Sequence, residues 1–188
     1  IGGVIIIATL GTALLADAFN VANTMPNILY NLLVGGALTA IFIPQLVRAF
    51  DDADGGHLFA SRLVTTISGI LLALVAVGVI FAPQLVYIYA PSFSTPGFET
   101  EREIAITLTR YCLPQIFFLG LFTMLGQVAN ARGSFAPLMW APIANNLVII
   151  VVFSAFLIKW PSVSVDSITS TQLQILGWGS TFAIVVQA

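Results

Sequence analysis

The stretch Leu63–Tyr89, LVTTISGILLALVAVGVIFAPQLVYIY, contains no charged residue. A helix that crosses the roughly 30 Å hydrocarbon core of a bilayer needs about 20 mostly apolar residues, and this stretch is longer. Charge-free runs recur along the chain, over residues 1–16, 18–47, 111–131, 133–158 and 167–188, and only the first is shorter than a full span. The sequence therefore predicts an all-α integral membrane protein, a bundle of about six transmembrane helices.

The expected helices cover most of the chain, with short polar loops between them. We place them at approximately residues 1–16, 24–48, 62–89, 103–130, 136–159 and 171–188. Ile1 is not an initiator methionine, and no polar flank precedes it or follows Ala188. We therefore expect a single partial transmembrane lobe that is truncated at both ends. An apolar start followed by Asp17 also resembles a signal peptide, but it has no positively charged leader.

Composition supports the membrane interpretation and excludes several function classes. Hydrophobic residues make up 59% of the 188 residues and charged residues only 7%, whereas an ordinary soluble domain is about a quarter charged. No basic stripe is present, so nucleic acid is not an expected partner. The single cysteine, Cys112, excludes an internal disulfide, and no metal site or cofactor is expected. The acidic group Asp51, Asp52 and Asp54 has no second acidic motif of the kind a membrane prenyltransferase uses, so we do not expect an enzyme.

Polar side chains interrupt the apolar runs. Four asparagines fall within residues 20–31, and Asn27 and Asn31 are four residues apart, which places them on one face of a helix. A second pair, Asn145 and Asn146, follows Pro142. Amides inside a bilayer need partners, which neighbouring helices or the water of a cavity can supply. The sequence leaves both alternatives open.

Two charged residues lie in or beside predicted spans. Asp17 separates two apolar runs. It is either a loop residue that caps the second helix or a carboxylate with a role in function. Arg110 lies at least one turn inside the fourth predicted helix, where it either extends to the membrane interface or faces a cavity. A charge near the bilayer centre costs at least roughly 2.5–3.5 kcal/mol, so a partner or water is expected for each.

The segment from Asp17 to Pro44, DAFNVANTMPNILYNLLVGGALTAIFIP, resembles the N-terminal signature of the MurJ/MviN family. The resemblance continues through residues 88–93, Arg110–Pro114, Asn130–Phe135 and Trp140–Asn146, which is nearly the whole chain. These are lipid II flippases of the multidrug/oligosaccharidyl-lipid/polysaccharide exporter superfamily, with fourteen transmembrane helices in two lobes. The resemblance implies that this chain is the N-terminal lobe and lies in the bacterial cytoplasmic membrane, with the loop at 48–62 in the cytoplasm.

In that family a hydrated, cationic cavity between the lobes takes the diphosphate–sugar headgroup, and alternating access carries it outward. The resemblance implies a polyprenyl-diphosphate lipid such as lipid II, the surrounding membrane lipids and a C-terminal lobe of the same chain as partners. Tyr30 stands where many relatives have a cavity arginine, and Gly35 where they have a glutamate. The alternatives are a related exporter of lipid-linked polysaccharide or drugs, and a membrane scaffold of the cell-wall machinery that transports nothing. The candidate cavity residues are Asp17, Asn23, Asn27, Tyr30, Asn31, Arg110, Asn145 and Asn146.

Overall fold

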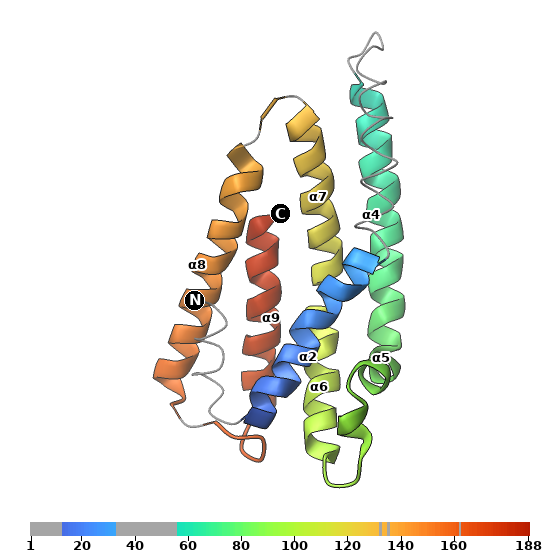
Figure 1. Cartoon of the computed structure of the whole chain (residues 1–188). Coiled ribbons are helices and arrows are strands. Elements are labelled where there is room, and N and C mark those ends of the chain that lie inside the picture. The colour runs from blue at the N-terminus through green and yellow to red at the C-terminus, as the bar shows by residue number, and fades with distance from the viewer. Residues whose placement is uncertain (1–12, 33–55, 132, 135, 162) are drawn as a thin grey trace.

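The computed structural model describes residues 13–32, 56–131, 133–134, 136–161 and 163–188. The described part is helical, with short connections (Figure 1). Its elements are α2 (Ala13–Tyr30), α4 (His57–Ile80), α5 (Ala82–Tyr89), the 3₁₀ turn η2 (Pro91–Ser94), α6 (Glu99–Cys112), α7 (Gln115–Ala131), α8 (Ala136–Lys159) and α9 (Ser170–Gln187).

Three of the described helical stretches are long and apolar enough to cross a membrane. They are His57–Ile80, the 32 residues Glu99–Asn130 and Met139–Lys159. The first and the third of these stretches are largely exposed at the outside of the bundle, where the large apolar residues Ile70, Leu147 and Ile158 are more than half exposed. Apolar surface of this extent is stable against lipid and unstable against water. The chain is therefore a multi-pass membrane protein.

Prolines divide two of the predicted spans. The span expected at 62–89 consists of α4 and α5, which meet at Phe81, two residues before Pro83. The span expected at 103–130 consists of α6 and α7, joined through Leu113 and Pro114. Proline has no backbone N–H to donate and its ring clashes with the preceding turn, so the helix bends or breaks at that point.

Asp17 lies within a helix, which corrects one expectation. The sequence suggested a connection between two helices here, but α2 runs without a break from Ala13 to Tyr30 and includes Asp17 and Pro26. The Asp17 side chain is exposed, and its charge does not interrupt the helix. The remaining parts of the first two predicted spans, residues 1–12 and 33–48, lie outside the described residues.

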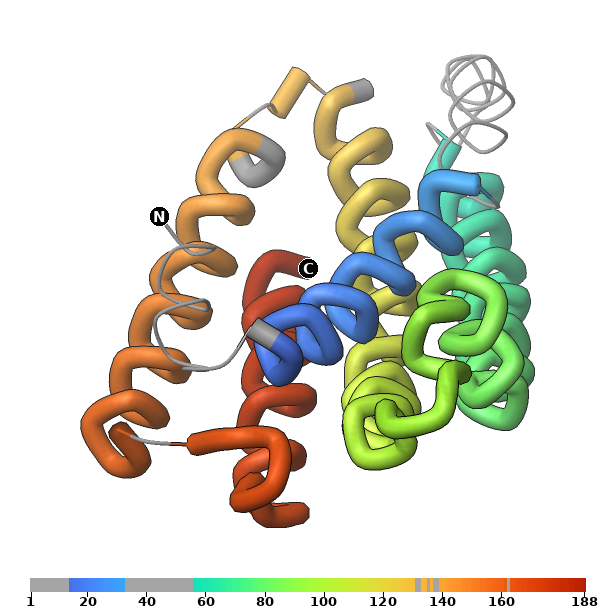
Figure 2. Tube along the Cα trace, turned by 60° about the horizontal axis from the view of Figure 1, so that its bottom comes forward, coloured from blue at the N-terminus to red at the C-terminus, as the bar shows by residue number. Residues whose placement is uncertain are grey.

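The α6–α7 stretch lies at the centre of the bundle. α9 lies between this stretch and α8, α2 crosses in front of it, and α4 stands beside α7 (Figures 1 and 2). One hydrophobic core joins α2, α6, α8 and α9, where the rings of Phe19 and Phe153 meet edge to face with centroids 5.3 Å apart. A second core joins α4 and α7 around Leu71 and Ile116. This arrangement brings four helices around one space.

Candidate substrate cavity

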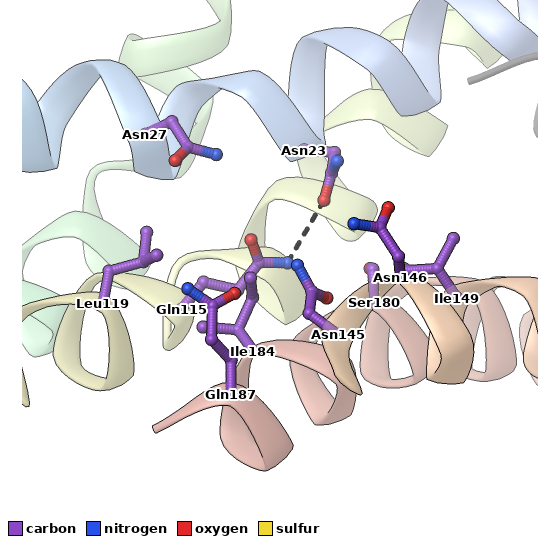
Figure 3. Close-up of a pocket in the computed structure, with 10 residues that line it drawn as sticks. All are labelled: Asn23, Asn27, Gln115, Leu119, Asn145, Asn146, Ile149, Ser180, Ile184 and Gln187. Atoms are coloured by element: carbon purple, nitrogen blue, oxygen red, sulfur yellow. Dashed lines mark hydrogen bonds between the residues drawn. The ribbon is translucent and has the colours of Figure 1, made fainter. Parts of the chain in front are cut away.

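A cavity of about 320 Å³ lies between α2, α7, α8 and α9. We call it the amide cavity, because six of its lining residues carry side-chain amides. Figure 3 shows the side chains of α2 directed toward those of α7, α8 and α9 across this space. The lining residues are Asn23, Asn27, Gln115, Leu119, Asn145, Asn146, Ile149, Ser180, Ile184 and Gln187.

Helical spacing explains why the amides of α2 and α8 face the cavity. Asn23 and Asn27 are four residues apart on α2 and therefore share one face. Asn145 and Asn146 lie one turn after Pro142 on α8. The side chain of Asn146 donates a hydrogen bond to the carbonyl of Pro142 at 2.8 Å, which fixes the amide against its own helix. Both helices thus present carboxamides to the same space.

Gln115 is the most deeply buried amide of the lining, with only 1% of its surface exposed. Its Nε2 donates to Oδ1 of Asn23 on α2 at 3.3 Å and to Oγ1 of Thr181 on α9 at 3.4 Å. The hydroxyl of Thr181 in turn donates to the carbonyl of Tyr111 on α6 at 2.7 Å. Gln115 is the first residue of α7, so these bonds link four helices, α2, α6, α7 and α9, just after the bend at Pro114.

Other amides of the lining are free to bind something else. Among the described residues, the side chains of Asn27, Asn145 and Gln187 have no hydrogen-bond partner. Each carboxamide offers two N–H donors and a carbonyl acceptor. Such groups in an apolar bundle are satisfied by water or by a ligand that carries several hydroxyl or amide groups.

The described lining is electrically neutral. It contains no Asp, Glu, Lys, Arg or His, and in the described part of the chain no three metal-ligating side chains gather. Carboxamides and a serine hydroxyl bind uncharged polar groups by hydrogen bonds, whereas a diphosphate is bound most strongly by arginine or lysine. The chemistry of this lining is therefore hydrogen bonding without charge compensation.

The structure brings together half of the residues that the sequence singled out. Asn23, Asn27, Asn145 and Asn146 line the amide cavity. The other four candidates are not among its lining residues. The Tyr30 hydroxyl donates to Thr123 Oγ1 at 2.5 Å and so joins α2 to α7. The side chains of the remaining three are exposed: Asp17 on α2, Asn31 in the π-helical turn after α2, and Arg110 in the last turn of α6.

Three polar lining residues were missed by sequence reasoning: Gln115, Ser180 and Gln187. Gln115 carried a usable signal, because it is an amide directly after a proline within the apolar run 111–131. Ser180 donates to the carbonyls of Leu176 and Gly177 in its own helix, both at 2.9 Å, and serine is common in membrane helices for this reason. Only its position opposite the asparagines relates it to the cavity.

Comparison with known proteins identifies the family. The family model described as lipid II flippase MurJ matches residues 6–188. A probable lipid II flippase MurJ of Rickettsia prowazekii is 27% identical over 170 residues, which cover 88% of this chain and 33% of the relative. The lipid II flippase MurJ of Burkholderia cenocepacia is 30% identical over 155 residues, covering 80% of this chain and 30% of the relative. The chain thus spans about a third of the length of these relatives, and over that length it belongs to the MurJ lipid II flippase family.

Proposed function

We propose that this chain is part of a transporter that moves lipid II across the bacterial cytoplasmic membrane, and that the amide cavity forms part of the wall that receives the headgroup. The observation that carries the proposal is a polar, hydrogen-bonding cavity inside an apolar bundle of a MurJ-family chain. A polar headgroup has to cross the bilayer core without contact with hydrocarbon, and such a wall gives it a place to do so. The function is transport and requires no catalytic chemistry.

The neutral lining favours a glycan cargo over a drug. An exporter of hydrophobic or cationic drugs is expected to have an apolar or acidic cavity, and the described lining is neither. A lipid-linked polysaccharide carries the same sugar and diphosphate chemistry, so it remains the nearest alternative cargo. A scaffold without transport has no need for unpaired amides that come from several helices and line one space.

Transport by this proposal requires more chain than the structure describes. In alternating access one group of helices moves against another around a central site. The described helices would be one side of that site, and the second lobe implied by the family would be the other. Asp17 and Arg110 are proposed to act at this boundary, because both are exposed charges on helices of the bundle. Arg110 lies about 16 Å along the Glu99–Asn130 span, where its charge needs a partner, water or the reach of its side chain to the membrane interface.

Reconstitution of the full-length protein tests the proposal. Proteoliposomes are loaded with lipid II that carries a fluorescent headgroup, and an impermeant quencher reports the fraction exposed on the outside. The expected result is that the quenchable fraction rises above that of protein-free vesicles, and that the same gene restores growth to a strain depleted of its own flippase. Vesicles containing heat-inactivated protein are the control. Quenching equal to that control, together with failure to restore growth, would refute the proposal.

A further inference from the structure

We propose that the amide cavity is a subsite for the uncharged, hydroxyl-rich sugar portion of the headgroup, and that the diphosphate is bound elsewhere. This inference rests on the proposed function and deepens it by assigning one part of the headgroup to named residues. Among the described residues, the lining has six carboxamides from four helices and no charged side chain. Sugar hydroxyls both donate and accept hydrogen bonds, and a carboxamide also offers both.

The arrangement of the amides supports a ligand rather than simple helix packing. If the amides served only to hold helices together, they would bond to one another, as Gln115 does to Asn23. Asn27, Asn145 and Gln187 have no such partner among the described residues, although they come from three different helices and line one space. Their N–H and C=O groups are available to a molecule that enters.

Gln115 is the deeply buried amide of the subsite, which we call its floor, and its orientation is fixed by hydrogen bonds. It is nearly completely buried and is held by donation to Asn23 and Thr181, while its Oε1 accepts no hydrogen bond from a described residue. Gln115 lines the amide cavity, so this unused acceptor belongs to a residue of the cavity wall. Figure 3 shows the Gln115 amide between Asn23 and the side chains of α8 and α9. A preorganised acceptor at the floor suits a donor such as a sugar hydroxyl.

The size and the apolar part of the lining fit this ligand class as well. A volume of about 320 Å³ lies at the lower end of the roughly 300–1,000 Å³ typical of ligand pockets. Leu119, Ile149 and Ile184 contribute apolar surface beside the amides. A sugar ring carries C–H faces as well as hydroxyl groups. The amides of the lining match the hydroxyl groups, and the aliphatic side chains match the C–H faces.

The test compares lipid II with a lipid that ends at the diphosphate and so lacks the sugars together with the peptide attached to them. Binding of lipid II and of the sugar-free polyprenyl diphosphate of the same chain length is measured with full-length protein in detergent. The test variants are Asn27→Leu and Asn145→Leu, which remove unpartnered amides and leave no protein group without its hydrogen bond. The control variant is Asn20→Leu, because Asn20 is an exposed amide of α2 that does not line the cavity. A shared melting temperature with wild type shows that each variant is folded.

We expect each test variant to lose roughly 2- to 10-fold in affinity for lipid II, as for a lost neutral hydrogen bond, with unchanged affinity for the sugar-free lipid. The Asn20→Leu variant should bind both lipids as wild type does. If the test variants bind lipid II as tightly as wild type, the cavity holds only water and the inference is wrong while the proposed function stands. Equal losses for both lipids would assign the cavity to the diphosphate and overturn the inference. Absence of lipid II binding by the wild type would overturn the proposed function and the inference with it.

Discussion

Gln115 combines a structural and a functional position in one side chain. Its donor side joins α7 to α2 and α9, and its Oε1, which accepts no hydrogen bond from a described residue, belongs to the lining of the amide cavity. In double-mutant cycles an interhelical hydrogen bond in a membrane protein is worth about 0.6 kcal/mol on average. The two bonds of Gln115 therefore stabilise the helix arrangement modestly, and their larger effect is to fix the orientation of the amide.

Replacement of Gln115 by leucine tests this dual position. We expect Gln115→Leu to lower the free energy of unfolding by about 1 kcal/mol, because two interhelical bonds are lost and Asn23 loses its donor. The melting temperature of full-length protein in detergent measures this change. The matched control is Gln84→Leu on α5, where the glutamine is exposed. If the Gln115→Leu and Gln84→Leu proteins have the same melting temperature, the two bonds of Gln115 contribute nothing to stability.

At the scale of the helices, α9 depends on close approach to both of its neighbours. A Cβ atom added at Gly177 would lie 2.5 Å from Cβ of Tyr111 on α6, and one added at Gly179 would lie 2.6 Å from Cγ1 of Val152 on α8. Small residues let membrane helices approach closely, and this contact replaces the hydrophobic effect that lipid does not provide. The two glycines therefore set the distances of α9 to the helices on its two sides.

Alanine at these glycines should destabilise the bundle. We expect Gly177→Ala to cost about 1–3 kcal/mol, since Cβ of Tyr111 moves only with its backbone. Gly179→Ala should cost less, because a terminal methyl of Val152 can move further. The control is Gly69→Ala on α4, where an added Cβ meets nothing within 4 Å and improved helix propensity adds up to about 1 kcal/mol of stability. Thermal unfolding of the three variants gives the order, and a Gly177→Ala protein as stable as Gly69→Ala would contradict it.

The sequence predicts the helical spans, but not the breaks within them or all of the residues that line the cavity. Charge-free length predicts helical spans, because only a helix satisfies the backbone in lipid, and α4 and α8 follow from it. The breaks at Phe81 and Leu113 depend on how each proline is accommodated, which composition does not determine. Spacing of four residues places Asn23 and Asn27 on one face, but Asn31 falls in a π-helical turn that changes the spacing. Gln187 and Ser180 join the site only through the packing of α9, a non-local effect that no local pattern contains.

At the scale of the whole molecule, the neutral lining of the amide cavity means that the cationic groups for a diphosphate lie elsewhere in the protein. Lipid II headgroups carry a diphosphate, and its negatively charged oxygens require cationic partners in a low-dielectric site. The described lining supplies none, and the chain spans about a third of its relatives. On the proposed function, the cations belong to parts of the protein outside this lining, with Arg110 as one candidate in this chain. A division between a neutral sugar wall and a cationic wall would make the headgroup enter in one orientation.

The orientation of the bundle in the membrane gives the last prediction. The start of α4, the end of α7 and the start of α8 lie at one end of the bundle, and the α5–α6 and α8–α9 connections lie at the other (Figure 1). The family resemblance assigns the first end to the cytoplasm. Single cysteines at exposed Ser92, Ser134 and Ser167 are introduced into full-length protein, in which the buried Cys112 and any other cysteine are first replaced by serine.

We expect the cysteines at positions 92 and 167 to react with an impermeant maleimide in intact cells, and the cysteine at 134 to react only after lysis. Two cysteines on one side and one on the other is the pattern that an odd number of crossings between 92 and 134 requires, and the Glu99–Asn130 span supplies one crossing. Labelling of all three in intact cells would mean that this span does not cross the membrane. The reversed pattern would keep the bundle but invert its orientation in the membrane.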